Sequence, residues 1–127
     1  MITEDYVSFE TAKLLKERGF GGECLSMYIS PKYNSGKGNP NDKRLAPHGR
    51  DNSYYEGYQY ECEAPTLQMT MKWLREVHHI TIGITFSLDI ITYEIQKDEK
   101  VITAISSSRS YEDMVEEAIK LCLENLI

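Results

Sequence analysis

The spacing of apolar residues changes inside residues 64–88, where a helical period gives way to strict alternation. Pro65 suits the first turn of a helix, because its fixed φ and missing amide fit there, and the apolar residues after it recur at helical spacing. From Ile80 to Leu88 apolar and polar residues alternate, which is typical of a strand buried on one face. The stretch therefore predicts a helix followed at once by a one-faced strand, and hence a sheet covered by helices.

Both ends of the chain also have helical patterns. Ser8 can cap a helix that runs to about Arg18, and Gly19 suits the position after its end. Near the other end, Ser110 and Asp113 have the spacing of a capping box, and the residues after them are amphipathic. We therefore expect a first helix after Ser8 and a last helix after Ser110.

A long hairpin is predicted between the first two helices. Residues 23–29 and 54–62 both alternate, and they flank the long polar segment of residues 30–53, which would form the tip of the hairpin. If the apolar faces of the two strands point the same way, Leu25 lies opposite Cys62, since a slip of one residue would reverse every side chain.

The C-terminal half predicts a meander. Residues 90–96 and 101–105 are joined by a charged turn, and together with the strand from Ile80 they form three consecutive strands. The order is helix, strand, strand, helix, strand, strand, strand, helix. It predicts one α+β domain over residues 1–127, in which an antiparallel sheet has three helices on one face.

Composition is that of an ordinary globular protein. Hydrophobic residues make up 41% and charged residues 27%, and no apolar run approaches the roughly 18 residues needed to span a bilayer. The N-terminus lacks the basic start and apolar core of a secretion signal, so we expect a cytoplasmic protein with no membrane partner. Three scattered cysteines predict reduced thiols, and the hairpin register places Cys24 and Cys62 on opposite faces, which argues against a disulfide.

Positive charge is concentrated in residues 30–53. The segment has five cations and two acids in a chain whose net charge is −6, and it is rich in glycine, asparagine and proline. So many breakers predict a loop without regular structure, and loops of this length are usually functional or disordered. Its cations could contact phosphates, while tyrosines at its base could stack on bases or anchor a protein. The candidate binding residues are Tyr33, Lys37, Lys43, Arg44, Arg50, Tyr54 and Tyr55.

Three interpretations of this loop stay open. The simplest is a mobile, solvated hairpin tip, the second is a protein-binding surface, and the third is a nucleic-acid-binding surface. Because the net negative charge opposes long-range attraction to nucleic acid, a protein is the favoured partner and nucleic acid the weaker alternative. An exposed sheet edge could also pair two copies into a homo-oligomer.

No residue pattern indicates catalysis, a cofactor or a metal. Metal sites usually offer ligands in close pairs such as C-x-x-C, whereas the cysteines of this chain are far apart. Cys122 falls on the apolar side of the last predicted helix, where burial would keep its thiol inert. We therefore expect a non-catalytic protein without a cofactor, and the alternative is a small enzyme with an unrecognised pocket.

Three blocks of the chain resemble a known group of proteins. They are VSFETAKLLKERGF at residues 7–20, APTLQMTMKWLREVH at residues 64–78 and SYEDMVEEAIKLCLENLI at residues 110–127. They are similar to short uncharacterised proteins carried by prophages and other mobile elements of anaerobic gut bacteria. All three blocks are predicted helices whose shared residues are core and caps, so the resemblance implies a common fold and ancestry without any catalytic or binding residue. It implies an accessory or regulatory protein that binds a host or phage macromolecule.

Overall fold

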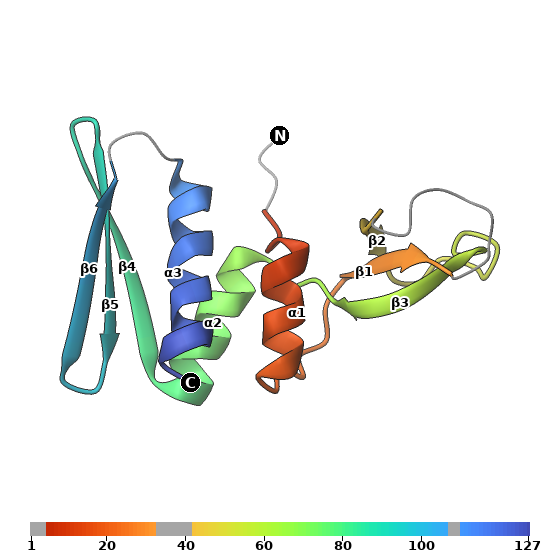
Figure 1. Ribbon diagram of the computed structural model, residues 1–127, viewed down its shortest axis with the longest axis horizontal. Helices are drawn as coiled ribbons and strands as arrows, with labels where there is room; N and C mark the ends of the chain where they lie inside the picture. The colour runs from red at the N-terminus through yellow and green to blue at the C-terminus, as the bar shows by residue number, and fades with distance from the viewer. Residues whose placement is uncertain (1–4, 33–41, 107–109) are drawn as a thin grey trace. The chain divides into compact units, whose positions relative to one another are not determined.

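The computed structural model of the chain describes residues 5–32, 42–106 and 110–127 (Figure 1). The chain divides into two compact units, each with a sheet of its own. The hairpin unit is Ser8–Pro65, and the meander unit is Thr66–Ile127 together with the segment before Ser8. The fold is α+β, as predicted, but its strands form two three-stranded antiparallel sheets, so the prediction of one sheet with three helices on one face is wrong. The prediction of one domain over residues 1–127 stays a prediction.

The hairpin unit begins with a capped helix. The Ser8 hydroxyl accepts a hydrogen bond from the Thr11 amide at 3.3 Å, which confirms the predicted cap. Gly19 follows the helix with φ of +90°, a conformation that glycine adopts without steric cost. The helix lies against the last strand of the unit. The elements of this unit are α1 (Phe9–Glu17), β1 (Ser26–Pro31), β2 (Arg44–Pro47) and β3 (Tyr58–Glu63).

Part of the predicted loop is a strand. β1 is central in its sheet, with β2 on one side and β3 on the other. Since β2 lies inside residues 30–53, the prediction that this segment has no regular structure is wrong for residues 44–47. Ala46 is 2% exposed and lies opposite Met27, and together with Ile29 these residues form the small core of the sheet. Residues 33–41 of the loop lie outside the described residues.

The register of β1 and β3 also differs from the predicted one. Cys62 lies opposite Tyr28 and not opposite Leu25, which precedes β1 and is 85% exposed. Tyr60 lies opposite Ile29, the neighbour of Tyr28, so Glu61 has no residue opposite it and forms a β-bulge. The predicted alignment is wrong because a bulge adds one residue to one strand, and an alternating pattern does not reveal it. All three cysteines are free thiols.

The meander unit follows the predicted order of elements. Its first helix begins at Leu67, two residues after Pro65, because the Thr66 hydroxyl caps it by accepting from the Met69 amide at 3.1 Å. His79 has φ of +58° and ends this helix directly before the first strand of the meander. The elements are α2 (Leu67–His78), β4 (Ile80–Ser87), β5 (Ile90–Lys97), β6 (Lys100–Ser106) and α3 (Tyr111–Asn125).

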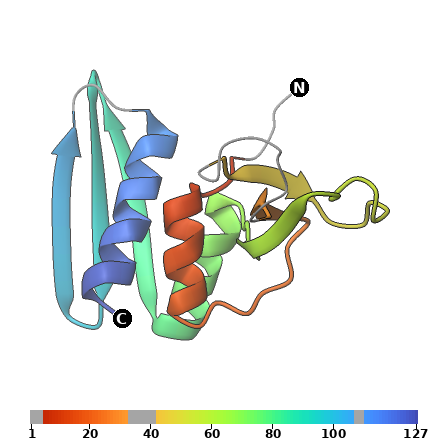
Figure 2. The same cartoon turned by 45° about the vertical axis from the view of Figure 1, so that its right-hand side comes forward.

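α2 and α3 cover one face of the meander (Figures 1 and 2). Ser110 caps α3 as predicted, since its hydroxyl accepts from the Asp113 amide at 3.1 Å. No helix in the described part of the chain is long and apolar enough to cross a membrane. The fully buried core of the unit includes Leu74, Ile80, Ile95, Met114, Ile119 and Leu123.

Candidate functional site

In the described part of the predicted binding loop, two arginines lie over tyrosine rings. The Arg44 guanidinium is 5.1 Å from the centre of the Tyr58 ring, and the Arg50 guanidinium is 5.6 Å from the centre of the Tyr54 ring. At these distances the electron-rich face of the ring attracts the cation. We call this group of residues the Arg–Tyr surface. It consists of Arg44, Arg50, Tyr54, Tyr55 and Tyr58.

Tyr55 attaches the Arg–Tyr surface to the core of the hairpin unit. Its ring packs against the core around Ile29 and meets the Tyr54 ring edge-on, with 5.0 Å between the ring centres. Its hydroxyl donates to the Pro47 carbonyl oxygen and accepts from the Arg50 amide, the latter at 3.1 Å. Tyr55 is therefore an anchor, whereas Tyr54, which is 51% exposed, is available to a partner.

A short polar turn presents Tyr54. The Asp51 carboxylate accepts hydrogen bonds from the Ser53 amide at 2.9 Å and from the Ser53 hydroxyl, as in an Asx turn. Hydrogen bonds from the Ser53 side chain and from the amides of Ser53 and Tyr54 hold the pKa of Asp51 below its usual value. Gly57 closes the turn with φ of +84° just before β3. Local hydrogen bonds therefore shape the start of this turn, and a hydrogen bond from the Lys32 amide to the Gly57 carbonyl oxygen at 2.8 Å ties its end to β1.

Charge pairing makes the loop less cationic than its composition suggests. The Arg44 Nε atom is 3.0 Å from an Asp42 carboxylate oxygen, and the Lys43 ammonium is 3.7 Å from a carboxylate oxygen of Glu61. A guanidinium that is both stacked and paired offers a planar and partly neutralised contact. Such a contact suits a protein interface better than a row of phosphates, because binding to phosphates depends on free positive charge.

Four of the seven predicted binding residues meet on the Arg–Tyr surface. Lys43 lies apart from them, and its ammonium is 5.2 Å from the centre of the Phe9 ring on α1. Tyr33 and Lys37 lie outside the described residues, so their role stays a prediction. Tyr58 belongs to the surface although the sequence places it only at the base of the loop. The four residues that meet are Arg44, Arg50, Tyr54 and Tyr55.

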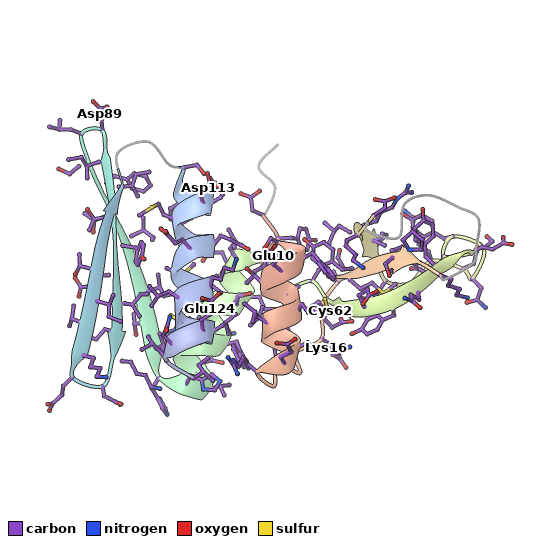
Figure 3. The ribbon with its side chains drawn as sticks, viewed as in Figure 1. Glu10, Lys16, Cys62, Asp89, Asp113 and Glu124 are labelled. Atoms are coloured by element: carbon purple, nitrogen blue, oxygen red, sulfur yellow. The ribbon has the colours of Figure 1, made fainter. Side chains whose placement is uncertain are left out.

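A pocket of about 360 Å³ lies between α1 and β3 of the same unit. The Lys16 ammonium donates to the Glu61 carbonyl oxygen at 2.8 Å and so joins the helix to the strand. Two residues that line the pocket, Lys16 and Cys62, are labelled in Figure 3. The sequence pattern does not indicate this pocket, because Lys16 and Glu61 are 45 positions apart. We call it the α1–β3 pocket, and it is lined by Phe9, Lys13, Lys16, Glu17, Glu61 and Cys62.

The thiols of the described residues are neutral, and one histidine lies beside a carboxylate. Burial raises the pKa of the Cys24 and Cys62 thiols to about 11 and that of Cys122 to about 12, so all three are protonated at neutral pH. His48 lies 2.9 Å from the Glu63 carboxylate. Residues 5–32, 42–106 and 110–127 contain no group of three or more histidine, cysteine or acidic side chains that could hold a metal ion.

Comparison of the chain with protein-family models, with curated proteins and with solved structures finds no match.

Proposed function

We propose that this protein is a non-catalytic binding protein that captures another protein through the Arg–Tyr surface. The proposal is carried by the two stacked pairs, Arg44 on Tyr58 and Arg50 on Tyr54. Tyrosine and arginine are among the residues most enriched where a few side chains supply most of the binding energy of an interface. Because Tyr55 anchors the group to the core, little side-chain entropy is lost on binding.

The biological setting is part of the same proposal. The resemblance of the three helical blocks to proteins of prophages and other mobile elements supports an accessory or regulatory protein that acts on a host or phage macromolecule. We propose that it acts in the cytoplasm, where its three free cysteines would stay reduced.

Nucleic acid is the alternative partner, because the exposed Tyr54 ring beside Arg50 could also stack on a base. The two partners differ in their response to salt. Binding to nucleic acid weakens steeply as salt rises, since each neutralised phosphate releases counterions, whereas an interface that rests on buried rings is much less sensitive. Capture that persists at high salt and after nuclease treatment supports a protein partner.

The test is affinity capture from host and phage lysate with matched variants of the full chain. Arg44→Ala with Arg50→Ala removes two positive charges from the Arg–Tyr surface. Lys72→Ala with Arg75→Ala removes two from exposed positions of α2 and is the control. Truncation of an interface arginine costs on the order of 1–2 kcal/mol, so the first variant should capture at least about tenfold less partner, and the control should match the parent chain.

Mass spectrometry identifies the captured protein, and thermal unfolding checks that both variants stay folded. Exposed substitutions usually change stability by no more than about 0.5 kcal/mol, so similar melting temperatures are expected. Equal capture by the parent chain and the Arg44→Ala, Arg50→Ala variant would remove the Arg–Tyr surface from the proposal.

A further inference from the structure

The α1–β3 pocket has the volume and the apolar lining of a site for a small ligand. Its volume of about 360 Å³ lies within the range of roughly 300–1,000 Å³ that is usual for small-molecule sites. Phe9 supplies an aromatic wall, and its ring is held edge-on by Tyr28 with 5.6 Å between the ring centres. The Cys62 side chain is 1% exposed and adds a second apolar element. The pocket therefore offers an aromatic contact to a ligand.

Lysines surround this apolar wall. Lys13 and Lys16 are three residues apart on α1, so they lie on the same side of the helix. Lys16 is held in place, because its ammonium donates to the Glu61 carbonyl oxygen and lies 5.4 Å from the centre of the Tyr60 ring. The Lys13 ammonium makes no hydrogen bond to another side chain or backbone group of the described residues. Lys13 acts on Glu61 through its charge, and its ammonium can still donate hydrogen bonds to a ligand.

Of the two carboxylates that line the pocket, that of Glu61 is already engaged. The Ser30 hydroxyl donates to Glu61, and the Lys43 ammonium is 3.7 Å from the same carboxylate oxygen. The Ser30 hydrogen bond and the charges of Lys43 and Lys13 hold the pKa of Glu61 below its usual value. Glu61 therefore stays ionised with its charge compensated, and it opposes the entry of an anion less than a free carboxylate would.

The thiol in the pocket is neutral. Burial raises the pKa of Cys62 to about 11, so a thiolate is nearly absent at pH 7. A thiolate would repel an anion, whereas a protonated thiol behaves as a small apolar group. With three lysines and two glutamates around it, the pocket combines an apolar wall with a small excess of positive charge.

We propose that the α1–β3 pocket binds a small organic acid, a carboxylate carried on a compact apolar body, with Lys13 as its cation and Phe9 as its apolar contact. This site is separate from the Arg–Tyr surface and does not depend on the proposed capture of a protein. The carboxylate lies at Lys13, and the apolar body lies against the Phe9 ring. A ligand that lacks the carboxylate loses the contact with Lys13, and one that lacks the apolar body loses the contact with Phe9.

The test is an NMR titration of the full chain, labelled with ¹⁵N, with three small probes. Benzoate has both a carboxylate and a ring, benzamide replaces the carboxylate with a neutral group of the same shape, and acetate lacks the ring. Benzoate is expected to shift the amides of Phe9, Lys13 and Cys62 in a saturable way. Benzamide and acetate are expected to bind at least tenfold more weakly.

An internal control comes from the turn between β5 and β6. This turn borders a hollow of about 630 Å³ that has lysines and acids but no aromatic side chain among its lining residues. Its amides should not follow the benzoate titration. Equal shifts at this turn and in the α1–β3 pocket would mean that the anion associates with lysines in general, and they would overturn the proposal.

Matched variants test the role of the cation. Lys13→Met keeps an unbranched apolar side chain on the helix but removes the charge, and Lys72→Met makes the same change at an exposed position of α2. The first is expected to weaken benzoate binding at least tenfold, and the second to leave it unchanged. Unchanged spectral dispersion shows that each variant is folded. Benzoate binding that survives Lys13→Met, or benzamide binding as tight as that of benzoate, contradicts the proposal.

Discussion

One buried histidine, His78, contributes to the pH dependence of the stability of this protein. The Nε2 atom of His78 is buried and has no hydrogen-bond partner among the described residues. Its ring meets the Trp73 ring edge-on, with 4.7 Å between the centres. Burial lowers the pKa of His78, and the positive charges of Lys97 and His79 lower it further. Protonation of this ring therefore opposes the folded state.

The pH dependence of stability follows from this shift. The pKa of His78 is lower in the folded chain than its value of about 6.5 in the unfolded chain, so the unfolded chain takes up the proton first. A neutral His78 contributes to the free energy of unfolding above about pH 6.5, and this contribution is lost as the pH falls below that value.

His78→Phe keeps a ring against Trp73 and cannot be protonated. Between about pH 7.5 and about pH 5.5 we expect it to lose less free energy of unfolding than the parent chain does. Urea denaturation at the two pH values measures the difference. Equal losses in both proteins would show that His78 is not the responsible group.

At the scale of the elements, the turn of the β4–β5 hairpin places a leucine at a position with positive φ. Leu88 has φ of +53° and is 102% exposed at the tip of this hairpin, beside Asp89, which is labelled in Figure 3. Two-residue hairpin turns favour asparagine, aspartate or glycine where φ is positive, because a bulky side chain is crowded there. Nearby, the Phe86 ring stacks on Tyr111 with 6.0 Å between the centres.

Leu88→Asn should therefore stabilise the protein. Asparagine tolerates positive φ, so relief of the crowding is expected to raise the free energy of unfolding by about 0.5–1 kcal/mol. Leu88→Val is the opposite control, since a β-branched side chain fits this conformation worse than leucine does. Denaturant midpoints in the order Asn, Leu, Val would support the explanation, and a less stable Leu88→Asn variant would refute it.

Across the whole molecule, the two units differ in charge. Ser8–Pro65 has eight lysines and arginines and eight acids, whereas the rest of the chain has six and twelve and so accounts for the entire net charge of −6. Both candidate binding features, the Arg–Tyr surface and the α1–β3 pocket, belong to the neutral unit. An anionic partner or ligand is therefore repelled mainly by the meander unit, and this repulsion weakens as salt rises.

The thiols of the two units offer a measurement of how each unit opens. Cys24 is partly exposed, while Cys62 and Cys122 are buried, and the pKa values of about 11 to 12 leave on the order of one thiol in a thousand or fewer ionised at pH 8. We expect a disulfide reagent to label Cys24 first and the buried pair at least about tenfold more slowly. In denaturant all three should react fast.

Mass mapping of labelled peptides follows each thiol separately. Different labelling rates for Cys62 and Cys122 would show that the hairpin unit and the meander unit open independently, and equal rates would show one cooperative opening. Fast labelling of both buried thiols in the native protein contradicts the burial on which this prediction rests.

The parts of the fold that could be predicted are those with a local cause. The caps at Ser8 and Ser110 and the meander from Ile80 depend on residues close together in the chain, so period and capping pattern reveal them. The bulge at Glu61 and the strand within residues 44–47 could not be predicted in this way. Both depend on how β1 pairs with segments on its two sides, and a turn-rich composition hides them.

The candidate site also has features that the sequence predicts and features that only the folded chain shows. Residue types and local charge pointed to Arg44, Arg50, Tyr54 and Tyr55, because cations and rings gather in one stretch of sequence. The separation of Lys43 from that group, the anchoring of Tyr55 and the whole α1–β3 pocket follow from folding. The reason is physical: helix caps and alternation are encoded within a few residues, whereas a pocket, a sheet partner or a stacked ring requires contacts between segments that only the folded chain brings together.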